Sequence, residues 1–194
     1  TGDSYCYIIE QCYSTMDIIA YCPRSDFQTN CIAGAFANIA VEGEAMRNCY
    51  ARGNVTVTGD PSYPPSWIGG LCGYAAWGPF ENSYSTGLVS VSIPNNYVGG
   101  FIGKLASGDV TNCFWDTETS GWIISDGGTG KTTTQMKNQT TFRIAGWNFL
   151  GVWAKRGVND SYPCLCGITP GCPCKLGNPI VDQLIYQHAE RMRK

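Results

Sequence analysis

Two short motifs alternate along the chain, and this repeat is the feature that most restricts its possible folds. The first motif is a small residue followed by an aromatic one, and it recurs at spacings of 37, 34 and 30 residues. Its copies begin at Cys12, Cys49, Ser83 and Cys113. The second motif is rich in glycine and occupies residues 68–73 and 98–103, with a weaker version at 32–37. Two motifs in phase indicate one structural unit, repeated along the chain.

The residues within each unit predict β-strands rather than helices. Val, Ile, Tyr, Thr and Gly dominate, and turn sequences such as Gly59-Asp60-Pro61 separate short β-type runs. The spacing varies at these turns, where insertions are tolerated. We therefore expect an all-β fold, a short parallel β-solenoid of about four coils, with equivalent residues about 4.8 Å apart in neighbouring coils.

Stacked coils would place equivalent side chains in rows. Four aromatic residues would form one row: Tyr13, Tyr50, Tyr84 and Phe114. The small residues before them would form a second row, and a third would contain Ile18, Val55, Val89 and Thr119. Cys12 and Cys49 would be neighbours close enough for a disulfide. We favour buried thiols instead, because Ser83 fills the same position without a partner.

The cysteine content predicts an oxidising, extracellular setting. The chain has 11 cysteines, an odd number, and they are concentrated near its two ends. Four lie close together in the C-terminal part: Cys164, Cys166, Cys172 and Cys174. We expect disulfides that cross between these two pairs or reach other cysteines. The alternative is a zinc site with four thiolate ligands, although the ligand spacing is shorter than usual.

Charge and composition exclude several classes of protein. Only 14% of residues are charged and the net charge is -2, which argues against nucleic-acid binding. The apolar fraction of 43% argues against a disordered chain. No apolar run approaches the roughly 20 residues that span a bilayer. A single histidine weakens any catalytic triad. Because the chain opens on Thr1, we expect it to be processed or excised from something longer.

The repeats resemble the GLUG-motif repeat family. The resemblance rests on residues 68–73 and 98–103, and on the Asn-Cys/Ser-Tyr/Phe motifs that start at Asn48, Asn82 and Asn112. Residues 112–121, 127–137 and 146–153 are similar to the segment that closes such arrays. The resemblance implies a parallel β-helix on secreted or surface proteins: adhesin-like proteins, non-catalytic parts of some bacterial immunoglobulin A peptidases, and phage structural or tail proteins. It implies no catalytic residues.

Two other motifs suggest chemistry, but each has a simpler explanation. Residues 125–132 nearly match a phosphate-binding loop, yet neither the preceding strand of a parallel sheet nor the long following helix is predicted. A glycine-rich turn into a short helix fits better, with Thr132 and Gln135 forming a capping box. Asp116 and Glu118 could serve a glycosidase, but a solvent-facing turn or a weak cation site is favoured.

We divide the sequence into four parts. Residues 1–30 form a Cys-containing N-terminal coil or cap, and residues 31–121 form the GLUG-like repeats. Residues 122–163, the closing segment, include a short helix. Residues 164–194 form a Cys-rich tail that ends in a helix, whose N-cap is Asn178. The apolar stripe of that helix could cover the solenoid or dock on another subunit: Val181, Leu184, Ile185 and His188.

The sequence favours a structural function without catalytic residues or cofactors. We expect a rigid spacer or display surface in an extracellular assembly, such as a virion, a tail or fibre, or a cell-surface layer. Its partners would be other protein subunits, in a homo- or hetero-oligomer. One alternative is a glycan- or receptor-binding adhesion module that uses exposed aromatic residues: Tyr63, Trp67, Trp77 and Tyr97. A second alternative is an accessory domain of a secreted hydrolase.

Overall fold

The computed structural model describes residues 7–22, 32–40, 44–60, 66–76, 78–93, 97–155 and 157–172. Several residues of interest lie outside these ranges. They include Tyr63, Trp77 and Cys174, and the whole C-terminal helix expected from residue 178, with Val181, Leu184, Ile185 and His188.

The regular secondary structure of the described chain is mainly short strands in parallel sheets, with few and short helices, which confirms the all-β prediction. Strands from successive repeats are neighbours in each sheet. A four-stranded sheet has the order β1 (Tyr7–Glu10), β6 (Glu44–Arg47), β11 (Phe80–Glu81) and β16 (Val110–Thr111). A five-stranded sheet has the order β18 (Thr129–Lys131), β17 (Phe114–Asp116), β12 (Tyr84–Ser85), β7 (Tyr50–Ala51) and β2 (Tyr13–Ser14).

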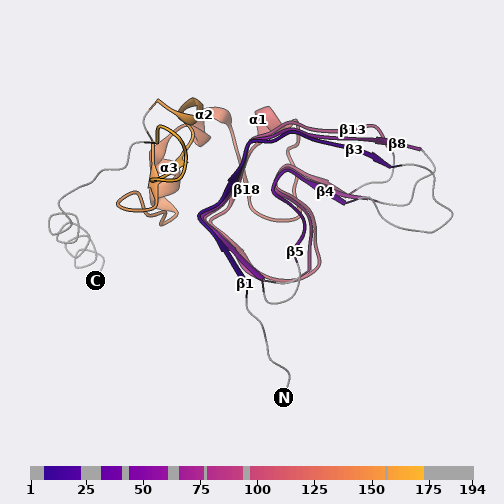
Figure 1. Ribbon diagram of the computed structural model, residues 1–194, viewed down its shortest axis with the longest axis horizontal. Coiled ribbons are helices and arrows are strands. Elements are labelled where there is room, and N and C mark those ends of the chain that lie inside the picture. Colours follow the sequence, from indigo (N-terminus) through magenta and orange to yellow (C-terminus); the bar gives the residue numbers. More distant parts are fainter. Residues whose placement is uncertain are drawn as a thin grey trace, which may run out of the picture.

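Three further sheets each contain three strands. One has the order β13 (Val89–Val91), β8 (Val55–Gly59) and β3 (Ile18–Cys22). Another has β14 (Tyr97–Gly99), β9 (Trp67–Gly69) and β4 (Ile32–Gly34). The last has β15 (Ile102–Leu105), β10 (Cys72–Ala75) and β5 (Ala37–Ala40). In Figure 1 the traces of successive repeats nearly coincide, so β3, β8 and β13 follow one path.

The registers confirm the rows expected from the repeat. Tyr13 pairs with Tyr50, Tyr50 with Tyr84, and Tyr84 with Phe114. The first three rings are stacked, with centroid distances of 5.1 Å for both neighbouring pairs. Ile18, Val55 and Val89 also pair in register. The fourth member expected in that row is different, because Thr119 lies in the short helix α1 (Thr117–Ser120) rather than in a strand.

A sharp corner precedes each aromatic residue. Gln11, Asn48, Asn82 and Asn112 occupy this corner and have positive φ angles of 53°, 53°, 47° and 54°. Asparagine tolerates the left-handed region better than most residues with a Cβ atom. The Asn-Cys/Ser-Tyr/Phe motif therefore has a structural meaning: the asparagine turns the chain between two strands.

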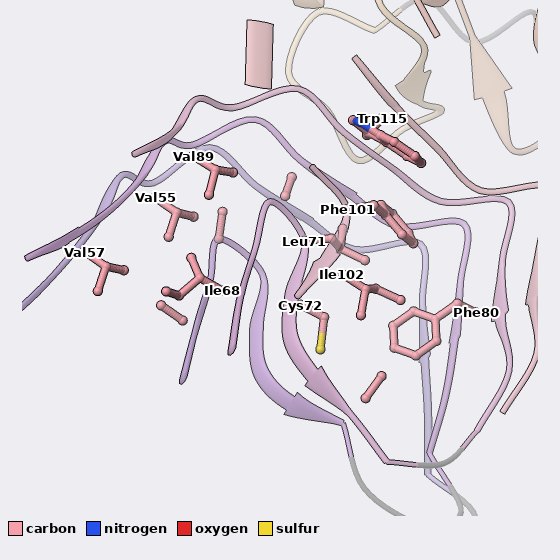
Figure 2. Close-up of a cluster of buried hydrophobic side chains, with 14 of the residues drawn as sticks. Val55, Val57, Ile68, Leu71, Cys72, Phe80, Val89, Phe101, Ile102 and Trp115 are labelled. Carbon is pink, nitrogen blue, oxygen red and sulfur yellow. The ribbon is translucent and has the colours of Figure 1, made fainter. Parts of the chain in front are cut away.

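The interior of the repeats contains one hydrophobic cluster, part of which Figure 2 shows. Its members include Val55, Ile68, Leu71 and Phe101, all of which are fully buried. The glycine motif brings the backbone into tight contact with this interior. At Gly100, a Cβ atom would lie 2.1 Å from Cδ1 of Trp115, so only glycine fits without movement of the ring.

The closing segment folds against the repeats and contributes to a second cluster. After β18 follow α2 (Thr133–Met136), α3 (Gln139–Ile144), β19 (Trp153–Ala154), the 3-10 turn η1 (Asn159–Ser161) and β20 (Cys164–Leu165). Strands β19 and β20 pair antiparallel. The capping box of Thr132 and Gln135 is confirmed at α2. This helix is one turn long, so it is not the long helix that a phosphate-binding loop requires.

Candidate binding surface

An outward-facing row of side chains begins at Trp67 and Tyr97. These residues start β9 and β14 and pair in register, so they lie side by side on neighbouring repeats. Tyr97 is 51% exposed, whereas Trp67 is half-buried. The structure thus brings together two of the four aromatic residues expected from the sequence. The other two, Tyr63 and Trp77, lie outside the described residues.

Each of these two aromatic residues faces a side chain of the following strand. The ring of Trp67 stacks on that of Tyr74, with centroids 4.5 Å apart. One repeat further on, Nζ of Lys104 lies 5.5 Å from the centroid of the Tyr97 ring. Tyr74 and Lys104 pair in register, so both repeats build the same arrangement. Lys104 also forms an ion pair of 3.1 Å with Asp126.

Sequence reasoning missed Tyr74, Lys104 and Asp126. A signal was available for the first two, since each lies seven residues after its aromatic partner, with the glycine motif between them. We refer to Trp67, Tyr74, Tyr97, Lys104 and Asp126 as the aromatic surface. It combines π faces with a neighbouring cation and carboxylate, a combination that can stack on an apolar ring face and hydrogen-bond to polar groups at its rim.

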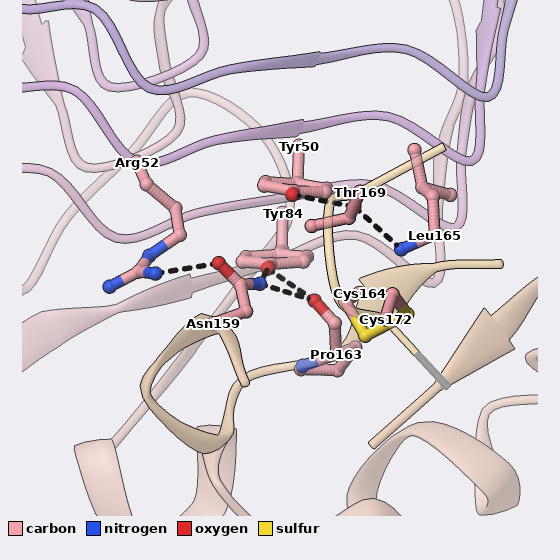
Figure 3. Close-up of a disulfide and its surroundings, with 9 residues drawn as sticks. All are labelled: Tyr50, Arg52, Tyr84, Asn159, Pro163, Cys164, Leu165, Thr169 and Cys172. Carbon is pink, nitrogen blue, oxygen red and sulfur yellow. Dashed lines mark hydrogen bonds between the residues drawn. A yellow bond between two sulfur atoms is a disulfide. The ribbon is translucent and has the colours of Figure 1, made fainter. Parts of the chain in front are cut away.

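A second set of aromatic residues fastens the closing segment and the start of the Cys-rich tail to the repeats, as Figure 3 shows. The buried hydroxyl of Tyr84 donates to the carbonyl of Pro163 at 2.6 Å. Nδ2 of Asn159 donates to both the Tyr84 hydroxyl, at 2.8 Å, and the Pro163 carbonyl, at 2.7 Å. The hydroxyls of Tyr50 and Thr169 lie 2.9 Å apart. The hydroxyls of Tyr50 and Tyr84 are therefore both paired with residues of the closing segment and the tail.

Arg52 extends this contact to the surface. Its guanidinium donates to Oδ1 of Asn159 at 2.6 Å and forms an ion pair with Asp160. The hydrogen bond and the positive charge of Arg52 lower the pKa of the Asp160 carboxyl. The pKa of the Tyr84 hydroxyl shifts in the opposite direction, because burial raises it well above its ordinary value. Both pKa shifts arise where the closing segment packs against the repeats.

Asp116 does not lie in a solvent-facing turn, and that prediction was wrong. Its side chain is fully buried and caps α1, accepting hydrogen bonds from the backbone N–H groups of Glu118 and Thr119. It also accepts from the hydroxyls of Thr133, at 2.9 Å, and Tyr162, at 2.6 Å. Burial and this bond raise the pKa of the Tyr162 hydroxyl. Through these hydrogen bonds Asp116 links α1, α2 and Tyr162.

The cysteines divide into two groups. Cys12, Cys49 and Cys113 are reduced. Cys12 is exposed, so the prediction of a buried thiol was wrong at Cys12, whereas Cys49 and Cys113 are buried. Burial is the main reason that the pKa of each of these two thiols rises to about 12, which keeps them protonated at neutral pH. Cys164 and Cys172 form a disulfide that crosses between the two pairs, and Cys22 is also disulfide-bonded. Two sulfurs of the alternative zinc site are therefore bonded to each other, and a disulfide supplies no thiolate ligands.

Across the described ranges, no group of three or more His, Cys, Asp or Glu side chains is arranged to hold a metal ion. In the same part of the chain, no helix has the length and apolar character needed to cross a bilayer.

Comparison with known proteins relates part of the chain to a bacterial protein. The chain is 40% identical over 123 residues to a protein of Evansella cellulosilytica described as a "Putative Gly-rich membrane protein". The match covers 61% of this chain but only 13% of the length of that relative. No family model matches the chain. No solved structure matches it either. The comparisons therefore relate about three-fifths of the chain to a small part of a much longer bacterial protein.

Proposed function

We propose that the stacked repeats form a short parallel β-solenoid and that the chain is a non-enzymatic structural component of an extracellular assembly. Such an assembly could be a virion, a tail or fibre, or a cell-surface layer, in which the solenoid is a rigid spacer or a display surface. The resemblance to GLUG repeats and the cysteine content support this proposal. The similarity to one small part of a much longer protein is consistent with a module in a larger architecture.

The observation that carries the proposal is the backbone hydrogen bonding between successive repeats. The N–H of Tyr50 donates to the carbonyl of Cys12 at 3.1 Å. One repeat later, Tyr84 donates to Cys49 at 3.0 Å, and Phe114 then donates to Ser83 at 3.0 Å. Each repeat is thus bonded to the next at the same position. A stack held in this way resists bending and stretching along its axis, as a spacer requires.

The test is the location and mass of the protein in its native source. Antibodies against the purified chain would be used to follow it through fractions of surface material, filaments and particles, and each positive fraction would be weighed by native mass spectrometry. The proposal expects the chain in a particle, filament or cell-surface fraction of high mass. Recovery only as a free intracellular monomer would contradict it, as would hydrolysis of a polysaccharide by the purified chain.

A second candidate function, glycan binding, is favoured by the aromatic surface. Trp67 stacked on Tyr74, with Lys104 beside Tyr97, matches the chemistry that holds sugars: aromatic faces against ring C–H groups, and charged groups at the rim. A glycan array would test it with the wild-type chain, Tyr97→Ala and Tyr21→Ala. Tyr21 is a matched control, because it is 71% exposed and lies on β3, outside the aromatic surface. Specific binding lost only in Tyr97→Ala supports this function, and an array without specific hits removes it.

A further inference from the structure

The two ends of the stack of repeats differ in whether the backbone N–H and C=O groups of their outer strands have hydrogen-bond partners. At the end nearer the C-terminus, residues 122–126 cover the last strands. The carbonyl of Ile124 accepts from the N–H of Gly100 at 3.0 Å. The Ser125 hydroxyl accepts from the N–H of Ile102 at 2.8 Å, and the Asp126 carboxylate accepts from that of Leu105 at 2.8 Å. Strand β18 also pairs with β17. The backbone edge at this end is therefore largely satisfied from within the chain.

The opposite end consists of the first repeat, and its edge is open in the part of the chain that the structure describes. Strands β1, β2, β3, β4 and β5 each stand last in their sheets, and no described strand pairs with their outer edges. We call this surface the first-repeat face. A row of unpaired N–H and C=O groups is a template for the addition of further strands.

The side chains of β3 differ from those at the same positions in the next repeat. Ile19 and Tyr21 point outward and are 81% and 71% exposed. Their partners in register on β8 are Thr56 and Thr58. The outward positions that hold threonine on β8 therefore hold large apolar residues on the edge strand β3. Exposed apolar side chains on an unpaired strand mark a contact surface.

Two rows of side chains begin at this face, and among the described residues no side chain continues either row beyond the first repeat. Tyr13 stacks on Tyr50 through one ring face and is only half-buried, whereas Tyr50 is fully buried between two rings. Glu10 is exposed and begins a row of alternating charge, in which Arg47 lies next and contacts Glu81 at 3.2 Å. The next member of the first row would be aromatic, and that of the second would be basic.

We propose that the first-repeat face binds a parallel coil of the same repeat chemistry, carried by a partner protein. That coil places an aromatic ring over Tyr13 and a basic side chain beside Glu10, and its strands continue the hydrogen bonding of β1, β2 and β3. The inference rests on the β-solenoid of the proposed function and names its partner.

A second copy of this chain is a poorer occupant. Its own far end is covered by residues 122–131, so copies cannot add head to tail through that edge. Two first-repeat faces related by a two-fold axis would bring their strands together antiparallel. Such pairing cannot keep every row in register, and it would bring two Glu10 carboxylates, one from each copy, to the same interface.

The test uses the full chain and a labelled peptide of residues 44–59 with Cys49 replaced by serine, the residue that naturally occurs at position 83. This peptide carries Arg47 and Tyr50, so in the added position it supplies the basic and aromatic residues expected. Fluorescence anisotropy measures its dissociation constant. Replacing Arg47 of the peptide by glutamate should weaken binding about threefold to tenfold, and Glu10→Arg in the protein should restore it.

The protein variant Ile19→Thr with Tyr21→Thr copies the residues of β8 onto β3 and should also weaken binding. Ile123→Thr with Ile144→Thr is the matched control, since these side chains are 84% and 83% exposed and lie outside the first-repeat face. Absence of peptide binding at about 1 mM, the weakest affinity worth measuring here, would overturn the proposal, as would equal binding of the charge-reversed peptide. A dimer in sedimentation that the Ile19/Tyr21 variant abolishes, without peptide binding, would assign the face to a second copy instead. The register of the repeats is measured independently by NMR (below), so a failure here is distinguishable from a failure of the proposed function.

Discussion

Replacing Gly100 by alanine tests how closely the glycine motif packs against the interior. A Cβ atom at this position would lie 2.1 Å from Cδ1 and 2.4 Å from Nε1 of Trp115. Ordinary carbon contacts are about 3.5–4.0 Å, so the indole has to move by more than 1 Å. Overpacking of this kind costs about 1–3 kcal/mol. Movement of the ring also strains the hydrogen bond of 2.9 Å from Nε1 of Trp115 to the carbonyl of Trp122, which adds about 1 kcal/mol. We expect Gly100→Ala to lower the free energy of unfolding by about 2–4 kcal/mol.

Urea denaturation followed by far-ultraviolet circular dichroism measures this loss. Gly151→Ala is the matched control, because no atom lies within 4 Å of its Cβ position, and it should change stability by less than about 1 kcal/mol. A double-mutant cycle with Trp115→Leu adds a second check, since a smaller side chain should relieve most of the overlap. A loss below about 0.5 kcal/mol in Gly100→Ala, or a loss that is undiminished in the Trp115→Leu background, would refute this packing.

Three further expectations concern other parts of the same architecture. Tyr84→Phe removes the hydroxyl that donates to the Pro163 carbonyl and should lower the free energy of unfolding by about 1–3 kcal/mol in urea titrations, and no loss would mean that the closing segment docks without this bond. Asn82→Ala should cost about 1–2 kcal/mol because its φ is 47°, whereas Asn82→Gly should cost less, and the reverse order in thermal unfolding would contradict the corner assignment. Because burial raises the pKa of the Cys49 thiol from 9.0 to about 12, the folded state retains a proton that the unfolded chain releases, so the urea midpoint should fall as the pH rises from 9.0 towards about 12. Cys49→Ser should flatten that decline, and an unchanged slope would show that the thiol contributes nothing to it.

The rows of the stack could be predicted from the sequence because their period is written in the residue types. Tyr13, Tyr50 and Tyr84 recur with matching neighbours, and their pairing in the structure follows from that phase alone. The local capping box of Thr132 and Gln135 was predictable for a similar reason, since both partners lie within one turn. Features set by the period of the repeat, or contained within one helical turn, can therefore be predicted from the sequence.

Contacts between distant segments could not be predicted in the same way. Asp116 was expected in a solvent-facing turn, but it is buried and accepts a hydrogen bond from Tyr162, which lies 46 residues later in the chain. Nothing near Asp116 in the sequence indicates this partner. The contact between the rings of Trp67 and Tyr74 depends on the bend between β9 and β10. The alternation of residues within either strand does not predict the angle of that bend. The aromatic surface therefore became visible only when the bend was known.

Successive repeats stack in parallel and in register. Scalar couplings across hydrogen bonds, measured by NMR on the isotopically labelled chain, test this stacking most directly. We expect couplings from the backbone nitrogen of Tyr50 to the carbonyl carbon of Cys12, from Tyr84 to Cys49, and from Phe114 to Ser83. Couplings from these nitrogens to other carbonyls, displaced by a residue or belonging to an antiparallel neighbour, would contradict this stacking.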